Sequence, residues 1–307
     1  MASPFGEMRV IINPRAGRGA VGRALVPLQR ALTDRGLSHH VCQTAGPGDA
    51  TRMAREALGQ GIRFLVAVGG DGTVHEVVNG MMGEAGPGVR DAVLGVVAAG
   101  SGGDFARTFG LRVGPEAAAA RLDGDTTRPI DVGHVSYRDE EGNPGTRWFA
   151  NIADVGFSAE ATARAATLPR ILGPGVYGVA ALATLARFGL EHVRVTLDSA
   201  SFEAMLSSLV VANCRFFGGG MMVAPNAVPD DGLLDVLAIG GHRAKMVVLA
   251  PKLYKGKHVP HPDIQEYRSR LVRVECDKPL RIEADGEVLG YTPAVFELTP
   301  KALRLKL

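Results

Sequence analysis

The 307-residue chain is 46% hydrophobic and 21% charged, which excludes a disordered protein and is sufficient for more than one packed core. Its formal net charge of +2 gives no reason to expect nucleic acid as a partner. The three cysteines are widely spaced and form neither a disulfide framework nor a C-x-x-C metal site, which favours a reducing, cytoplasmic setting.

The first third of the sequence alternates short apolar runs with helical stretches. Strands are predicted at Met8–Ile12, Ser38–Gln43, Phe64–Val68 and Val93–Val97. Helices are predicted at Val21–Arg35, at Ala50–Gly59, from Val74 onward, at Asp104–Phe109 and at Glu116–Leu122. This order of elements predicts an α/β domain with a parallel sheet over residues 1–128.

After Ile130 the pattern changes to short strand-like runs separated by turn residues. These runs lie at 131–136, 147–152, 193–197, 206–211, 233–239, 271–275 and 280–283. Helical insertions are expected at 175–188 and at 244–254. The pattern predicts an antiparallel second domain over residues 129–307, whose last strand is a candidate to return to the first domain.

The first glycine-rich segment, Gly17, Gly19 and Gly22, has the spacing G-x-G-x-x-G of a dinucleotide-binding turn. That class requires an acidic residue at the end of the second strand, where this chain has Gln43 and Thr44. We therefore expect the preceding turn to face phosphate through its backbone amides and its arginine. An ordinary strand-to-helix loop is the alternative.

The most specific signal is Gly69-Gly-Asp-Gly-Thr73, between an apolar strand and a helix. Glycines let the backbone pass close to a polyphosphate, and Asp71 offers a carboxylate to a metal or a hydroxyl. The P-loop pattern G-x-x-x-x-G-K-[ST] is absent from the sequence, which excludes that kinase class. A capping box of Thr73 and Glu76 is the structural alternative for those two residues.

A second loop, Gly100–Asp104, follows its strand in the same way. Two glycine-rich loops at the carboxyl ends of parallel strands indicate one ligand cleft. Asp104 joins Asp71 as a candidate to hold a metal directly or through water.

These motifs resemble a known family. Asn13–Gly17, Gly69–Gly80 and Gly100–Arg107 are similar to the catalytic domain of bacterial diacylglycerol kinases, within the sphingosine kinase superfamily. The similarity continues in the family's order through Asp154–Phe157, Asn213, Gly218–Gly220, Ala224–Asn226, Pro229–Asp235, Lys255–His258 and Asp285–Glu287. It spans nearly the whole chain.

The resemblance implies a nucleotide-binding α/β domain like that of phosphofructokinases and NAD kinases, followed by a β-sandwich domain for a lipid substrate. The residues that match the family's nucleotide contacts are Asn13, Pro14, Arg15, Ala16, Gly17, Thr44, Gly70, Asp71, Gly72, Thr73, Val74, His75, Glu76 and Ser101. The implied cofactors are ATP and Mg²⁺.

The resemblance also implies a structural magnesium at the side chain of Asp231 and the carbonyls of Val228 and Leu233. An acidic turn suits a cation on general grounds, and a plain turn is the alternative. The family pattern favours Glu287 as general base with Asp285 supporting it, and Asp71 is the second candidate. A charged β-turn at Asp285-Gly286 is the structural alternative.

The chain departs from the family in its second glycine loop, where Ser101 replaces the usual threonine and Gly103 the usual asparagine. We expect an ATP-dependent lipid kinase that converts diacylglycerol to phosphatidic acid. An NAD kinase-like enzyme for a soluble substrate is one alternative. A nucleotide- or lipid-binding regulator without activity is another, and Gly103 motivates it. The acceptor lipid and the oligomeric state stay open, a homodimer included.

We expect a cytoplasmic protein that associates peripherally with a membrane. Met1–Val10 lacks the pattern of a secretion signal, and no stretch approaches the ~18 unbroken apolar residues of a membrane span. Basic residues outnumber acidic ones between His242 and Lys278, which suits an anionic lipid surface, although a solvated surface explains single residues equally well. The apolar helix at 175–188 is expected in the core, with an acyl groove as the alternative.

Overall fold

The computed structural model divides the chain into two units. Unit 1 comprises Met1–Val132 with Thr299–Leu307, and unit 2 comprises Gly133–Leu298. The structure describes residues 3–83, 86, 91–98, 103–111, 114–167, 176–185, 188–241, 249 and 251–307. The chain passes into unit 2 within β5 (Thr127–Arg138) and returns within β17 (Glu287–Lys306).

Unit 1 is built on a parallel sheet of strand order β4-β3-β1-β2, and the end of β17 pairs with β4. Its other strands are β1 (Met8–Ile12), β2 (His39–Gln43), β3 (Phe64–Gly69) and β4 (Val93–Ala98). β3 is buried along its whole length, as expected for a central strand of a parallel sheet covered on both faces. The predicted α/β fold of this part is confirmed.

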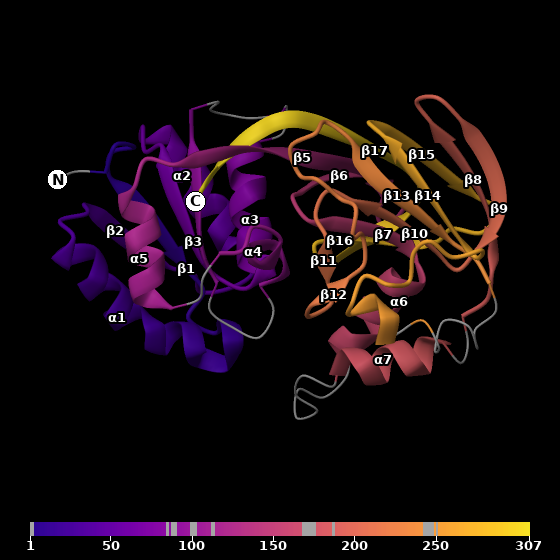
Figure 1. Ribbon diagram of the computed structural model, residues 1–307, viewed down its shortest axis with the longest axis horizontal. Coiled ribbons are helices and arrows are strands. Elements are labelled where there is room, and N and C mark those ends of the chain that lie inside the picture. The colour runs from indigo at the N-terminus through magenta and orange to yellow at the C-terminus, as the bar shows by residue number, and fades with distance from the viewer. Residues whose placement is uncertain are drawn as a thin grey trace. The chain divides into compact units, whose positions relative to one another are not determined.

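Helices cover both faces of this sheet (Figure 1). They are the 3₁₀ helix η1 (Ala16–Gly19), α1 (Ala20–Asp34), α2 (Asp49–Gly59), α3 (Asp71–Met82), α4 (Asp104–Thr108) and α5 (Pro115–Asp123). α1 and α5 pack with alternate strand residues such as Val10 and Val66 in one apolar cluster, whereas α2 and α3 pack against each other. The predicted start of α3 at Val74 is wrong, because the helix already begins at Asp71, inside the glycine motif.

Unit 2 is an antiparallel β-rich unit, as predicted. Its strands are part of β5, β6 (Pro144–Phe149), β7 (Ile152–Gly156), β8 (Glu191–Leu197), β9 (Ser201–Leu206), β10 (Ser208–Ala212), β11 (Phe216–Phe217), β12 (Met221–Met222), β13 (Leu234–Ile239), β14 (Ile264–Ser269), β15 (Leu271–Cys276), β16 (Arg281–Ala284) and part of β17. The main order is β14-β13-β10-β7-β16-β17, and β15 links β17 to β8 and β9.

Two helices of unit 2 lie beside these strands, α6 (Phe157–Thr167) and α7 (Val176–Leu185), and they pack against each other. The sequence pattern did not predict α6. It predicted a helix over 175–188 where α7 is found, and residues 175, 186 and 187 of that range lie outside the described residues. Ala180 and Thr184 of α7 are buried. The predicted helix at 244–254 falls largely outside the described residues. In the described parts of the chain, no helix is long and apolar enough to cross a bilayer.

Candidate active site

The loop after β1 begins with a side-chain turn. The amide of Arg15 donates to Asn13 Oδ1 at 3.1 Å, and the amide of Ala16 donates to the Asn13 carbonyl at 3.1 Å. Gly17 has a φ of 57°, and Pro14 is partly exposed. Arg15 is exposed at the carboxyl end of a parallel strand, where α/β sheets bind their ligands.

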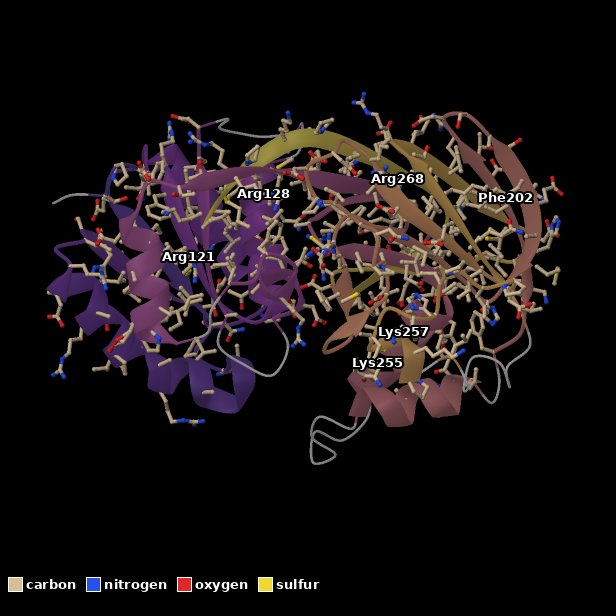
Figure 2. All side chains as sticks on the ribbon, viewed as in Figure 1. Arg121, Arg128, Phe202, Lys255, Lys257 and Arg268 are labelled. Atoms are coloured by element: carbon tan, nitrogen blue, oxygen red, sulfur yellow. The ribbon has the colours of Figure 1, made fainter. Side chains whose placement is uncertain are left out.

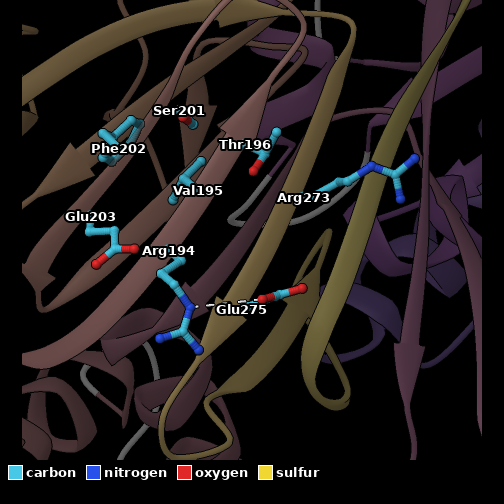
Figure 3. A pocket seen from close by; sticks show the side chains of 8 residues that line it. All are labelled: Arg194, Val195, Thr196, Ser201, Phe202, Glu203, Arg273 and Glu275. Atoms are coloured by element: carbon cyan, nitrogen blue, oxygen red, sulfur yellow. Dashed lines mark ion pairs between the residues drawn. The ribbon is translucent and has the colours of Figure 1, made fainter.

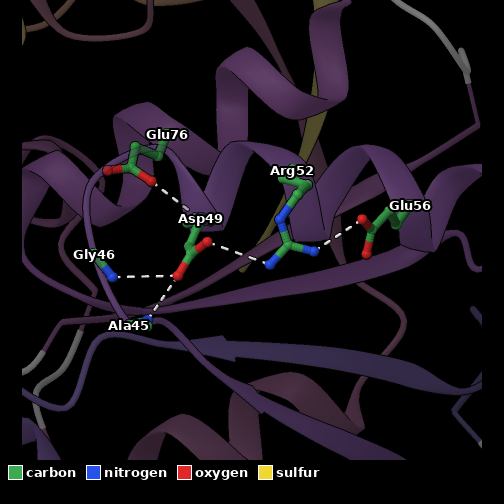
Figure 4. A network of polar contacts seen from close by, with 7 residues as sticks. Ala45, Gly46, Asp49, Arg52, Glu56 and Glu76 are labelled. Carbon is green, nitrogen blue, oxygen red and sulfur yellow. Dashed lines mark hydrogen bonds and ion pairs between the residues drawn. The ribbon is translucent and has the colours of Figure 1, made fainter.

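The loop after β2 is held at the same edge of the sheet. The amide of Thr44 donates to the carbonyl of Ile12 at 2.9 Å. Asp49, the first residue of α2, accepts the amides of Ala45 at 2.7 Å and Gly46 at 3.2 Å, and it pairs with Arg52 (Figure 4). The amide of Ala45, followed by Arg52 and the amide of Gly46, lowers the pKa of Asp49. The side chain of Asp49 therefore fixes the loop that carries Thr44.

The glycines of the loop after β3 have two different roles. A Cβ on Gly69 would lie 2.3 Å from Thr73 Oγ1, so this glycine is required by packing within the protein. Gly70 and Gly72 have no atom within 4 Å of an added Cβ, and Gly70 is extended at φ −93°. Neither packing nor positive φ explains glycine at these two positions. They leave open space at the first turn of α3, which fits a polyphosphate approaching the backbone amides.

Asp71 joins the two glycine-rich loops. Its Oδ2 accepts the amides of Gly103 at 3.0 Å and Asp104 at 3.2 Å, and its Oδ1 accepts the amide of Phe105 at 3.0 Å. Asp71 thus caps the N-terminus of α4 from a different helix. Both oxygens are already used by amides, so the geometry favours a role in shaping the loop over the predicted role as second candidate for the base. Ser101 and its neighbours at 99–102 lie outside the described residues.

The predicted capping box of Thr73 and Glu76 is wrong. α3 begins at Asp71 with Gly70 as its N-cap, so Thr73 and Glu76 do not occupy the capping positions. Glu76 Oε2 instead accepts the amide of Ala50 at 3.0 Å, in the first turn of α2 (Figure 4).

The remaining residues of the predicted nucleotide set lie inside unit 1. Thr73, Val74 and His75 are buried, and Asn79 Nδ2 donates to the His75 carbonyl at 2.9 Å. Their side chains support α3 from within. In the described part of the predicted set, Arg15 and Gly72 are exposed, and residues 13, 14, 16, 17, 44, 70, 71 and 76 are partly exposed.

In unit 2, Asp285 and Gly286 form the two-residue turn that joins β16 to β17. Their φ values are 52° and 87°, and both are positive as in a type I′ hairpin turn. Glu287 follows as the first residue of β17 and pairs with Ala284 across the hairpin. The β-turn considered from sequence is therefore present, and it places Glu287 at the base of the turn with partial exposure.

Asp285 is buried and accepts three backbone amides. Its Oδ2 accepts the amide of Ala150 at 3.0 Å, and its Oδ1 accepts those of Asn151 at 3.0 Å and Ile152 at 3.1 Å. Its own amide donates to the Ile152 carbonyl at 2.8 Å. The carboxylate of Asp285 fixes the hairpin that carries Glu287, which agrees with a supporting role.

The acidic turn predicted to bind magnesium is already charge-paired. Asp231 Oδ1 accepts the amide of Leu233 at 3.0 Å, and its other oxygen pairs with Arg268. The Val228 carbonyl accepts the amide of Asp230 at 2.9 Å. Asp231 therefore already has a cationic partner in Arg268, and the magnesium site at this turn stays a prediction.

The motifs quoted from the sequence contain Asp154 and Asp235 but assign them no role, and Glu283 was not singled out from the sequence. Burial raises the pKa of Asp235 to about 6, and its Oδ1 lies 3.9 Å from Arg268 Nε. Asp154 and Glu283 are buried opposite each other on β7 and β16. The available signal was a single acidic residue inside an apolar strand, as in Ile152–Gly156.

One surface pocket of unit 2 is lined by none of the predicted site residues. It has a volume of about 470 Å³ and is formed by β8, β9 and β15, with Arg194, Phe202 and Arg273 among its walls (Figure 3). Arg194 Nε lies 3.8 Å from Glu275 within it. The two arginines and two glutamates that line this pocket balance in charge, and none of them is a predicted site residue.

Two family models match the chain. The diacylglycerol kinase catalytic domain matches residues 7–135, and the YegS C-terminal NAD kinase beta sandwich-like domain matches residues 151–307. A diacylglycerol kinase of Mycobacterium tuberculosis is 32% identical over 306 residues, covering 98% of this chain and 95% of the relative. A Pseudomonas aeruginosa protein named "Probable lipid kinase YegS-like" is 33% identical, covering 97% and 93%.

Solved structures share the fold. The crystal structure of a diacylglycerol kinase from Bacillus anthracis superposes with a TM-score of 0.72 at 21% identity, covering 99% of this chain and 97% of the other. Yeast NADH kinase complexed with NADH gives a TM-score of 0.52 at 11% identity, covering 99% and 83%. At these identities the likeness concerns the fold alone.

Proposed function

Because the chain belongs to the family of diacylglycerol kinases and YegS-like lipid kinases, we propose that it phosphorylates the free hydroxyl of diacylglycerol with ATP, giving phosphatidic acid. The observation that carries the proposal is the loop at 69–72. Gly70 and Gly72 leave open space at the first turn of α3. Asp71 fixes this turn to α4 by accepting hydrogen bonds from three backbone amides.

The nucleotide half of the reaction belongs to unit 1. The amides at the start of α3 and the exposed Arg15 supply the two kinds of donor that bind phosphate oxygens. Magnesium bound with the nucleotide would neutralise the charge that develops on the transferred phosphoryl group. Asp71 and Asp104 are the carboxylates of this unit that would hold its water shell, since magnesium keeps several waters in such sites.

The acceptor half of the reaction belongs to the hairpin of unit 2. The hydroxyl oxygen of the lipid forms a bond to the γ-phosphorus, the bond from that phosphorus to the bridging oxygen breaks, and ADP leaves. Glu287 takes the hydroxyl proton, with Asp285 holding the turn at which Glu287 is placed. The partial exposure of Glu287 leaves its carboxylate accessible to a substrate.

The membrane-facing surface proposed for unit 2 is the exposed segment Lys252–Lys257 (Figure 2). It holds Lys252, Lys255 and Lys257 around Tyr254, whose exposed fraction is 57%. Basic residues near an anionic bilayer each contribute about 1 kcal/mol, and an exposed tyrosine suits the interface.

Replacing Lys255 and Lys257 by glutamate should reduce flotation with phosphatidylserine vesicles and leave activity on short-chain, soluble diacylglycerol unchanged. Equal flotation of both proteins would contradict this surface.

The test of the proposed activity is transfer of labelled γ-phosphate from magnesium ATP to a panel of lipids in mixed micelles, with NAD as a soluble acceptor. The panel holds diacylglycerol, a sphingoid base, ceramide, phosphatidylglycerol and an isoprenoid alcohol. Label on diacylglycerol is expected. Label on another lipid would change the acceptor, label on NAD alone would favour the soluble-substrate alternative, and no label would favour a regulator without activity.

A further inference from the structure

Two carboxyl groups face each other in the interior of unit 2. Asp154 on β7 is the direct antiparallel partner of Glu283 on β16, so both side chains project from the same face of the sheet. Their exposed fractions are 2% and 0%. The neighbours of Glu283 along β16, Ile282 and Ala284, belong to the apolar core. The carboxyl pair therefore lies on the other face, beside α6.

The first turn of α6 contacts both carboxyl groups. Asp154 Oδ1 accepts the amide of Ala159 at 3.3 Å, and its Oδ2 accepts the hydroxyl of Ser208 at 2.6 Å. Glu283 Oε1 accepts the hydroxyl of Ser158 at 3.3 Å. Glu283 Oε2 is buried and has no hydrogen-bond partner among the described residues. Asp154 thus accepts a backbone amide as well as a hydroxyl, whereas the donors at Glu283 are the hydroxyls of Ser158 and Thr162.

The basic groups packed around this pair are used elsewhere. Arg281 Nε pairs with Glu160 Oε2 at 3.0 Å, and Arg281 Nη1 lies 3.7 Å from Glu140 Oε1. Arg164 of α6 donates to Thr184 Oγ1 at 3.1 Å. The remaining nearby charge is the carboxylate of Asp285, which is also negative. Among the described residues, neither Asp154 nor Glu283 has an ion pair.

Two buried carboxylates without a cation cannot both stay ionised at moderate cost, so the pair retains a proton. The donors around Asp154, including the N-terminus of α6, favour its anion, so the proton resides on Glu283. The pKa values agree with this assignment. Burial raises the pKa of Asp154 to about 7, and burial together with the charge of Asp154 raises that of Glu283 well above its ordinary value.

The position of Glu283 in the hairpin connects this proton to the reaction. β16 leads from Glu283 directly into the turn of Asp285 and Gly286 and then to Glu287. We propose that Glu283, in its neutral form, is a positioning residue for phosphoryl transfer: it seats the hairpin that carries Glu287 against the first turn of α6. This inference rests on the proposed function and adds to it a residue that acts through the placement of the base.

The test compares Glu283→Gln, which keeps the shape of the neutral acid but has no proton to lose, with wild type and with Glu283→Ala. Because the folded protein holds a proton that the unfolded chain has released, the folding equilibrium of wild type should weaken with rising pH by up to tenfold per unit. In Glu283→Gln this dependence should vanish once the pH lies about one unit or more above the pKa of Asp154, which is about 7, since Asp154 is then ionised in the folded protein as well.

The same series is assayed for turnover from about pH 6 to about pH 10. Wild type should lose kcat on the alkaline side with an unchanged KM for ATP, and Glu283→Gln should lack this alkaline loss. Glu283→Ala should lower kcat about a hundredfold at every pH, the scale of a small misplacement of reacting groups. Glu297→Gln, the same change at an exposed position of β17, is the matched control and should behave as wild type.

An alkaline loss of kcat in Glu283→Gln equal to that of wild type would overturn the proposal, as would wild-type turnover in Glu283→Ala. The unfolding comparison needs no lipid or nucleotide. If wild type phosphorylated no lipid, the proposed function and the positioning role would fail together. Separately, if the stability difference between wild type and Glu283→Gln were the same at every pH, the assignment of a shared proton to Asp154 and Glu283 would be overturned.

Discussion

Asp71 in unit 1 and Asp285 in unit 2 are two aspartates of glycine motifs that do the same structural work in different settings. Each carboxylate accepts three backbone amides, those of residues 103–105 and of residues 150–152. Asp71 is partly exposed at the start of a helix, whereas Asp285 is buried in a tight turn at φ 52°. An aspartate of a glycine motif can therefore fix the backbone conformation around a ligand without itself reacting.

The largest effect is expected for Asp285→Ala. This change leaves three buried amides without acceptors and should lower the free energy of unfolding of unit 2 by about 3 kcal/mol or more. The single tryptophan, Trp148, lies in β6 of unit 2, and its fluorescence reports on denaturation of this unit. Asp277→Ala, at an exposed ion pair, is the control and should leave the unfolding transition nearly unchanged.

A smaller effect is expected for Asp71→Ala, because its site is partly open to water that can satisfy the released amides. Loss of this cap should destabilise the α4 region by about 1–2 kcal/mol and weaken ATP binding. Hydrogen exchange of the amides at 103–105 measures the cap, and equilibrium dialysis measures the nucleotide. Unchanged exchange at these amides would show that Asp71 does not hold the second loop.

A still smaller effect is expected for Gly103→Asn, which introduces the residue that the family usually has there. Gly103 has a φ of 73°, and an added Cβ would lie 3.4 Å from Ala98 Cβ. Asparagine tolerates this backbone region, so stability should change by less than about 0.5 kcal/mol. The hydrogen bond from the backbone amide of residue 103 to Asp71 should persist. Gly103→Val should be clearly less stable in the same thermal unfolding assay. Equal destabilisation by both residues would mean that the space, and not φ, selects glycine.

The smallest effect concerns the ion pair of Asp231 and Arg268. Both side chains are partly exposed, at 26% and 47%, so Asp231→Asn should change stability by less than about 1 kcal/mol. If Arg268 holds the place of a cation, added magnesium should not raise the unfolding temperature of wild type without nucleotide. A magnesium-dependent rise that Asp231→Asn abolishes would restore the metal site predicted from sequence.

The regular part of the fold could be predicted from the sequence, and the exceptions have physical reasons. β3 and α2 follow apolar periodicity and were predicted nearly to the residue. The start of α3 was misplaced because three glycines indicate a loop, although Gly72 lies within the helix. α6 was missed because it follows β7 directly, within a motif that looks like a continuous strand.

The loops that form the site could be predicted from the sequence, but the role of each side chain within them could not. The motifs located Asp71, Asp285 and Glu287. The amides that donate to Asp71 and Asp285, however, lie 32–34 and 133–135 positions away from them in sequence. Glu76 shows the same limit, because its partner, Ala50, lies in another helix. The protonation of Glu283 depends on burial opposite Asp154, which strand pairing alone determines.

In the proposed reaction Asp285 shapes the hairpin while Glu287 accepts the proton. The most direct measurement is transfer of labelled phosphate from ATP to diacylglycerol by Glu287→Gln, with Trp148 fluorescence and ATP binding measured on the same sample. We expect wild-type stability and ATP binding, with turnover lowered about a hundredfold or more, because a general base is lost. Near-wild-type turnover of Glu287→Gln would contradict it.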